Sequence, residues 1–131
     1  MNDYTLSSIA SYAVNNGLNT NAPAEDIVKT TRPIGPKVDI GAYESSFTCG
    51  VSTAASGVFI WTGSLNNDWF ECSNWNQGAI PSANIDVEIP VTANNPRISG
   101  TTPANVKTIE IQPNAELNID VTNNGKLNIA N

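Results

Sequence analysis

Hydrophobic and polar residues alternate in the C-terminal half of the chain, in short runs typical of β-strands. The clearest run is Ile85-Asp86-Val87-Glu88-Ile89, in which one face is apolar, the other is acidic, and Pro90 ends the run. Turn residues separate this run from the others. The other predicted strands are Val58 to Thr62, Ile109 to Ile111, Leu117 to Val121 and Leu127 to Ile129. The pattern therefore predicts a β unit over residues 58–131.

A short internal repeat is compatible with two architectures for this unit. Leu117-Asn118-Ile119 returns ten residues later as Leu127-Asn128-Ile129. In a β-solenoid, Asn118 and Asn128 would stack as a ladder between rungs, and the pattern would stop at Asn131 in the middle of the stack. In a β-sandwich, the repeat would be a hairpin across Asn124-Gly125. The predicted fold class is all-β, either a short β-solenoid start or a small β-sandwich.

The N-terminal third of the chain shows much weaker periodicity. From Thr5 to Val14 the apolar residues have helical spacing, and Asn15-Asn16-Gly17 would end a helix of two turns. Val38-Asp39-Ile40 predicts a short strand, and the sequence between these two elements is rich in Pro and Gly. We therefore predict an irregular, partly helical cap-like segment over residues 1–46, loosely packed or leaning on the rest. Residues 47–57 are small and polar and predict a linker.

The composition excludes several classes of function. The chain has 131 residues, a net charge of −6, 19 Asn, 12 Thr, 11 Ser and no His. Without His, the chain itself holds no Ser-His-Asp or Cys-His nucleophile and no two-His zinc site. Only six Lys and Arg are present, which disfavours a nucleic acid or an anionic membrane surface as partner.

Membrane and secretion signals are also missing from the sequence. No apolar run approaches the roughly 18–20 residues of a membrane span, so we expect no membrane insertion. Met1-Asn2-Asp3-Tyr4 does not begin a secretion signal. We therefore expect the chain to be a piece of something larger, whose signal lies elsewhere.

The N-terminal third resembles the closing segment of right-handed parallel β-helix proteins of the pectate-lyase-like type, which are large secreted bacterial proteins. The resemblance rests on Asp3-Tyr4 with Leu6, on residues 11–17, on Thr31-Arg32-Pro33, and on residues 38–44 with the sequence VDIGAYE. The chain has Tyr12 where Pro is usual. It also lacks most of an Asp-Gly-rich middle and keeps only Asp26 upstream of Arg32.

Residues 60–98 resemble a Trp-rich module of secreted bacterial proteins and autotransporter-type adhesins. The residues that carry this resemblance are Ile60-Trp61-Thr62-Gly63, Asp68-Trp69, Ser73-Asn74-Trp75, Gly78, Pro81, residues 86–90 and Pro96. In those families the Trp cluster opens a β-rich unit whose following strands form solenoid rungs. The two resemblances together imply a junction between two modules of a large extracellular or cell-surface protein.

The tryptophans Trp61, Trp69 and Trp75 allow two interpretations. Flat aromatic faces stack on sugars, whereas buried indoles would each add on the order of 150–250 Å² to a core that is poor in Leu. Core packing is favoured for the set. We expect Trp69 to be the most exposed of the three and, with the loop residues Asp68 and Asn67, to form the candidate ligand-binding site.

The two cysteines, Cys49 and Cys72, are predicted to form a disulfide, because an even pair in a secreted protein usually does so. The alternative is two buried thiols. The bridge would tie the linker to the Trp-rich module.

Carboxylates provide the other candidate chemistry. Asp86 and Glu88 lie about 7 Å apart on one strand face, in principle a glycosidase or lyase pair, but a solvated strand face is favoured. Calcium is conceivable with so many Asp and Asn oxygens, yet no stretch has the spacing of a calcium loop. We predict no catalytic residue, no metal site and no cofactor.

Three functions compete. The first is a non-enzymatic structural or adhesive module of a large secreted or cell-surface bacterial protein. The second is a carbohydrate-binding module that uses an exposed Trp. The third is a non-catalytic remnant of a polysaccharide-degrading β-helix enzyme. The expected partners are an extracellular polysaccharide or neighbouring modules of the same chain.

Overall fold

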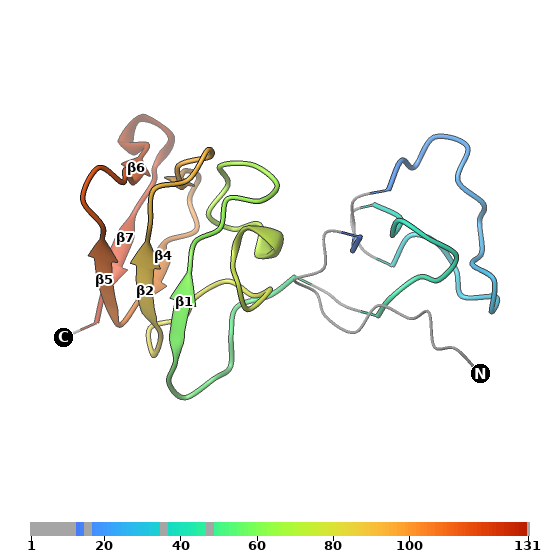
Figure 1. The fold of residues 1–131 in the computed structure, drawn as a ribbon, viewed down its shortest axis with the longest axis horizontal. Coiled ribbons are helices and arrows are strands. Elements are labelled where there is room, and N and C mark those ends of the chain that lie inside the picture. Colours follow the sequence, from blue (N-terminus) through green and yellow to red (C-terminus); the bar gives the residue numbers. More distant parts are fainter. Residues whose placement is uncertain (1–12, 15–16, 35–36, 47–48, 131) are drawn as a thin grey trace.

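A computed structural model describes residues 13–14, 17–34, 37–46 and 49–130. The helix predicted over Thr5 to Val14 lies outside the described residues, apart from Ala13 and Val14, which are in a turn. Figure 1 shows an irregular N-terminal part and a separate region of short strands.

The C-terminal region is all-β, as predicted, and its strands are two to four residues long. Among the described residues, the strands are β1 (Val58–Ile60), β2 (Asp86–Ile89), β3 (Arg97–Ile98), β4 (Ala104–Val106), β5 (Thr108–Ile111), β6 (Asn118–Ile119) and β7 (Leu127–Ile129). Two single turns of 3-10 helix, η1 (Cys72–Asn74) and η2 (Val121–Asn123), interrupt the loops.

Every pair of these strands is parallel, and the pairs form three small sheets. The sheet orders are β1-β2-β5, β3-β6 and β4-β7 (Figure 1). Asp86 pairs with Thr108, Arg97 with Asn118, and Ala104 with Leu127, so the period is about 22 residues in each sheet. We call the set β2, β3 and β4 the middle rung and the set β5, β6 and β7 the last rung.

This pairing corrects two expectations about the ten-residue repeat. No hairpin forms across Asn124-Gly125, because β6 pairs with β3 and β7 pairs with β4. Asn118 and Asn128 also do not stack on each other, since they lie in different sheets. Asn128 instead donates its amide to Oδ1 of Asn105 at 3.0 Å, across the β4-β7 pair. The ten-residue repeat therefore relates β6 to β7, two strands of the same rung, and does not relate one rung to the next.

The interior is a column of aliphatic side chains under a cluster of aromatic ones. The alternation predicted for residues 85–89 is confirmed, because Ile85, Val87 and Ile89 are buried while Asp86 and Glu88 face outward. In-register stacking repeats this alternation in every rung, since side chains in paired positions point to the same face. The buried core is Phe59, Trp61, Trp69, Trp75, Ile85, Val87, Ile89, Ile98, Ala104 and Val106.

Polar side chains on the outer faces pair from one rung to the next. Asp86 accepts hydrogen bonds from the Thr108 hydroxyl at 2.6 Å and from Lys107 Nζ at 3.2 Å, and these donors hold the pKa of Asp86 below its usual range. Glu88 accepts a hydrogen bond from the Gln112 amide. These hydrogen bonds stabilise the charged side chains of Asp86 and Glu88 on the outer face of the stacked strands.

Asp120 joins the last rung to the middle rung at the β3-β6 sheet. Its carboxylate accepts hydrogen bonds from the Thr122 hydroxyl, the Asn123 amide and the Arg97 guanidinium, which together hold the pKa of Asp120 far below its usual range. Its backbone carbonyl accepts from Gly125 N–H at 2.8 Å. A side chain at Gly125 would lie 2.3 Å from the Ile98 carbonyl oxygen, so only glycine fits at this approach.

The N-terminal segment is irregular, as predicted, and is held by buried carboxylates rather than by strands. The predicted strand Val38-Asp39-Ile40 does not form, although Val38 and Ile40 bond through their backbones to Gly17 and Ala13. Glu44 accepts hydrogen bonds from the N–H groups of Ile34 at 3.0 Å and Asp39 at 3.2 Å.

A buried ion pair and a second carboxylate complete this loop. Arg32 Nε lies 3.1 Å from Glu44 Oε2, and both side chains are buried. Asp26 accepts from the N–H groups of Val28, Thr30 and Glu44. Burial raises the pKa of Asp26, but these donors outweigh it and leave the pKa below its usual value. The carboxylate that pairs with Arg32 is thus Glu44, while Asp26 organises the backbone.

The in-register positions Ile98 and Ile119 provide a matched test of the stack. Ile98 is completely buried and Ile119 is 38% exposed. We expect Ile98→Ala to lower the free energy of unfolding by about 2–5 kcal/mol and Ile119→Ala by about 1 kcal/mol or less. Urea titrations of both variants measure the difference. Equal costs would contradict the register.

Acid is expected to destabilise the fold through Asp86 and Asp120. Their pKa values are lowered on folding, so the stability they contribute is present above the unfolded pKa of about 3.9 and is lost as the pH falls through the folded pKa. The urea midpoint should therefore drop below about pH 4. Asp120→Asn should flatten that drop, and an unchanged acid limb in this variant would show that Asp120 is not responsible.

Candidate functional site

The Trp-rich loop between β1 and β2 closes one end of the stack. Trp61 and Trp69 are stacked with ring centroids 6.5 Å apart, and Trp75 meets both rings edge-on at 5.1 and 4.7 Å. Such offset and edge-to-face arrangements are favoured by the ring quadrupoles. The Trp61 indole donates to the Asn94 carbonyl at 2.7 Å, and the Trp75 indole donates to the Trp69 carbonyl at 2.9 Å.

The expectation that Trp69 is exposed is wrong, because the side chain is completely buried. Its neighbour Asp68 forms a parallel bridge with Arg97, so Trp69 follows in register with the inward-facing Ile98. Two backbone hydrogen bonds fix this position, from Trp69 N–H to the Arg97 carbonyl and from Arg97 N–H to the Asn67 carbonyl. Core packing, the favoured interpretation of the three Trp, is what the structure shows.

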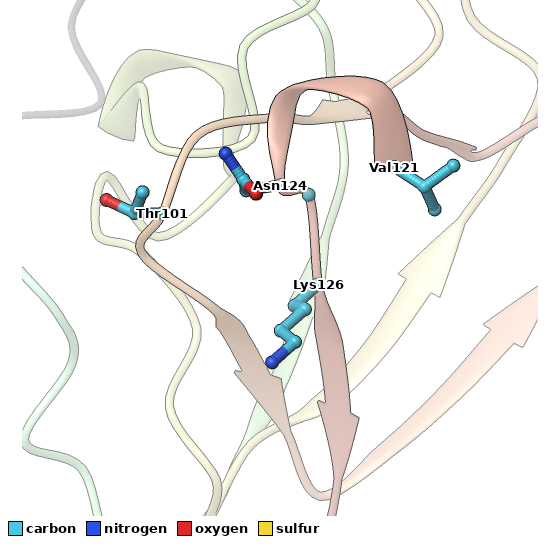
Figure 2. A pocket seen from close by; sticks show the side chains of 5 residues that line it. Thr101, Val121, Asn124 and Lys126 are labelled. Carbon is cyan, nitrogen blue, oxygen red and sulfur yellow. The ribbon is translucent and has the colours of Figure 1, made fainter.

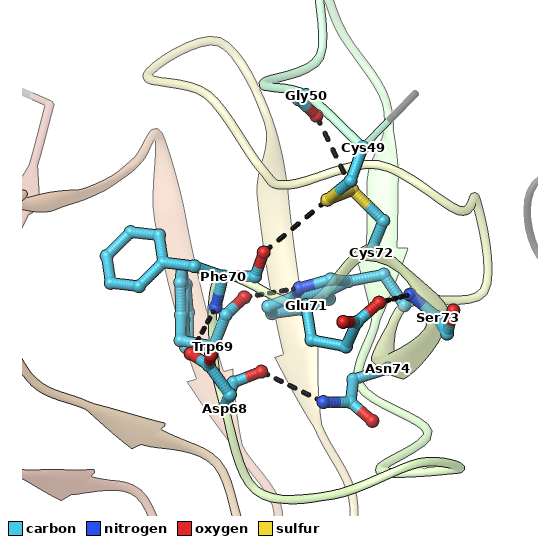
Figure 3. Close-up of a disulfide and its surroundings, with 10 residues drawn as sticks. Cys49, Gly50, Asp68, Trp69, Phe70, Glu71, Cys72, Ser73 and Asn74 are labelled. Carbon is cyan, nitrogen blue, oxygen red and sulfur yellow. Dashed lines mark hydrogen bonds between the residues drawn. A yellow bond between two sulfur atoms is a disulfide. The ribbon is translucent and has the colours of Figure 1, made fainter. Parts of the chain in front are cut away.

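The other two members of the candidate ligand site, Asn67 and Asp68, are exposed as expected. The hydrogen bonds of Asp68 stabilise the loop itself. The Asp68 side chain accepts a hydrogen bond from Phe70 N–H at 2.9 Å (Figure 3). Its carbonyl accepts from the Asn74 side chain at 2.9 Å, and its N–H donates to Asn66. With Trp69 facing inward, the three residues do not present a common surface to a sugar.

Asn74 is the residue that organises this loop, and the sequence pattern did not single it out. Its side chain is completely buried yet fully bonded. Oδ1 accepts from the N–H groups of Leu65 and Asn66, and Nδ2 donates to Asn66 Oδ1 and to the Asp68 carbonyl. The signal available in the sequence was an Asn placed between Ser73 and Trp75, where a buried amide could satisfy a loop backbone.

The predicted disulfide between Cys49 and Cys72 is present, with a Cα–Cα distance of 5.5 Å. Figure 3 shows it lying against the backbone of residues 70–73. The segment expected to be a linker is also bonded to the Trp-rich loop. Val51 bridges Ile80 in parallel, and Ile80 N–H donates to the Gly50 carbonyl at 2.9 Å. The disulfide therefore reinforces a strand-like contact at the start of the stack.

A hollow of about 540 Å³ lies beside the loops of the middle and last rungs (Figure 2). It sits between the loop after β3 and the loop from η2 to β7. Thr101, Val121, Asn124, Gly125 and Lys126 line it. The lining offers one ammonium, one hydroxyl and one amide on exposed loops, and Figure 2 shows no convergence of these groups on one point.

The described residues contain neither a cluster of metal ligands nor a membrane-spanning helix. Within the described residues, no group of three or more Cys, Asp or Glu could hold a metal ion. No described helix is long and apolar enough to cross a membrane. Asp86 and Glu88, the candidate carboxylate pair, lie on one outer face and are bonded to Lys107, Thr108 and Gln112.

One family matches the chain. Residues 60–131, more than half of the sequence, match the family described as Domain of unknown function (DUF8693). No curated protein and no solved structure matches. The matched region begins at the end of β1 and contains the Trp-rich loop and both complete rungs.

Removing the disulfide should destabilise the stack. The bridge joins cysteines at a sequence separation of 23, which corresponds to about 3 kcal/mol in the chain-entropy model. We expect the Cys49→Ala/Cys72→Ala variant to lose about this much in urea unfolding. The control is reduced wild type. If a reducing agent leaves the midpoint unchanged, the bridge does not stabilise the fold.

Trp75 and Trp69 should respond differently to replacement by Phe. Trp75→Phe leaves the buried Trp69 carbonyl without its indole donor, whereas the Trp69 indole N–H has no hydrogen-bond partner among the described residues. Trp75→Phe should therefore cost about 1–3 kcal/mol more than Trp69→Phe. Thermal unfolding of the two variants makes the comparison, and the reverse order would refute the role of that hydrogen bond.

Proposed function

The chain belongs to the DUF8693 family, and we propose that it is a non-enzymatic structural module of a large secreted or cell-surface protein. In this proposal, residues 58–130 are the start of a β-solenoid that the Trp-rich loop closes at one end. The adhesive role belongs to the larger protein, as the resemblance to adhesin-type modules implies.

The observation that carries the proposal is the in-register parallel stacking of the middle and last rungs. Three sheets each receive one strand from each rung, with nearly the same spacing along the chain in all three. Repeating this arrangement makes a quasi-one-dimensional stack in which each rung contacts only its neighbours. Such a stack can act as a spacer between other modules of a long polypeptide.

The side chains support a structural role over a chemical one. The tryptophans that would bind a sugar are used in the closing cluster. The outward acids of the middle rung are engaged by Lys107, Thr108 and Gln112. The partners we propose are neighbouring modules of the same polypeptide.

The disulfide supports an extracellular location. Such bridges form and persist in oxidising compartments and are rare in the cytosol. Cys72 is buried, and the bridge holds the first strand-like contact of the stack to the Trp-rich loop. This covalent link would help an extracellular module to stay folded under conditions that favour unfolding.

Interstrand NOEs test the solenoid. In the full chain, parallel register places the backbone of Val87 beside Ile109 and that of Asn105 beside Asn128. We expect NOEs between these pairs. Backbone NOEs between β6 and β7 would indicate the hairpin and overturn the proposal.

A single-molecule pulling experiment tests the structural role. With the full chain tethered at both ends, we expect a resolvable unfolding force peak. The disulfide shields the segment between its cysteines from load, so reduction should lengthen the unfolded chain by about 75 Å. Extension without a force peak would contradict a module that holds others apart under tension.

A further inference from the structure

The last rung leaves an apolar edge in each of the three sheets. β5, β6 and β7 are the terminal strands of their sheets in the described part of the chain. Their inward side chains occupy the same register positions as buried side chains of the middle rung. Ile89 and Ile98 are completely buried, yet their partners Ile111 and Ile119 are 45% and 38% exposed.

The third sheet repeats this contrast. Val106 is completely buried, and its partner Ile129 is 52% exposed. The difference is one of position, because all these residues are β-branched aliphatics on the inner side of paired strands. What covers the middle rung is visible in the structure, namely the strands of the last rung.

From these positions we infer that the edge formed by β5, β6 and β7 is a docking surface for one further parallel rung. The occupant is an extended polypeptide segment that carries aliphatic residues at the same three inward sites and keeps the spacing of the two rungs before it. This inference rests on the solenoid in the proposed function, and it adds the chemistry of the neighbouring module.

The hydrogen bond between Asn105 and Asn128, which we call the side-chain ladder, indicates which polar group the occupant carries. Asn128 donates its amide to Asn105 Oδ1, so the ladder leaves the carbonyl oxygen of Asn128 on the exposed side of the last rung. An Asn of a further rung would donate to it in the same way. The occupant therefore carries an amide at this position.

The opposite end of a second copy of this chain does not supply such a rung. There, Asn67, Asp68 and Trp69 already occupy the edge of β3 through two backbone hydrogen bonds with Arg97. The outer edge of β1 is engaged as well, because Ile60 N–H donates to Asn76 Oδ1 at 2.9 Å and the Ile60 carbonyl accepts from Asn76 N–H at 3.0 Å. A segment of the rung type satisfies all three edges, whereas two of the three edges at that end of a second copy are already engaged.

Extending the full chain by one rung tests the inference. Because Val106 pairs with Ile129, Lys107 aligns with Ala130, and a second copy of residues 108–130 joined after Ala130 continues the register in place of Asn131. We expect the extended chain to have a higher urea midpoint than the native chain. In the extended chain, Ile119→Ala should lower the midpoint as much as Ile98→Ala does in the native chain.

A matched control carries the same extension with Ser at the copied positions of the three inward sites, Ile111, Ile119 and Ile129, and of the three core-packed residues Ile109, Leu117 and Leu127. It should leave the midpoint and the effect of Ile119→Ala at their native values. Equal gains from both extensions, or no gain from either, would overturn the inference. If the parallel NOEs are present while the extension fails, the docking surface is refuted and the solenoid stands.

Sedimentation of the native chain addresses the competing occupant. We expect a monomer across the concentration range, because a second copy does not present a matching rung. A concentration-dependent dimer that Ile119→Asp and Ile129→Asp abolish would assign the edge to self-association and overturn the inference.

Discussion

Parallel in-register stacking is the constraint on which the rest of this structure depends. Each inward side chain is covered by the equivalent side chain of the next rung, and each backbone edge is satisfied by the next strand. A stack built in this way has two ends, and neither end is covered by the repeat itself. Ile98 and Ile119 show the consequence, since the same residue type is buried in one rung and partly exposed in the next.

The Trp-rich loop solves the problem at the first end with a longer connection. Val58 pairs with Asp86, and Asp86 pairs with Thr108, so the first connection of this sheet is longer than the second. The additional length accommodates three indoles and the buried Asn74. Large aromatic side chains fill the space that another rung would occupy, and Asn74 satisfies backbone groups that strands would otherwise pair.

The N-terminal segment uses a different means of stabilisation. Residues 13–46 contain no helix or strand in their described part, and their buried groups include Asp26, Asp39 and Glu44. Asp26 and Glu44 accept backbone N–H donors, and Glu44 also pairs with Arg32. Charge-assisted hydrogen bonds of this kind hold a loop without a large apolar core.

The alternation of Ile85 to Ile89 and the cysteine pair were enough to predict an all-β unit and its disulfide, because these depend on local pattern and on residue type. Stacking partners were not predictable in this way. The similarity of Val87-Glu88-Ile89 to Ile109-Glu110-Ile111 marks the true period, but the closer ten-residue repeat obscured it.

The role of Trp69 was also decided by tertiary structure alone. A loop position beside Asp68 and Asn67 is compatible with exposure, and only the bridge to Arg97 turns the indole inward over Ile98. The sequence by itself determined which residues alternate, which cysteines are available and which chemistries lack their His. Tertiary structure decided which strands stack and which end the Trp-rich loop closes, because register is a long-range property that no local run of residues specifies.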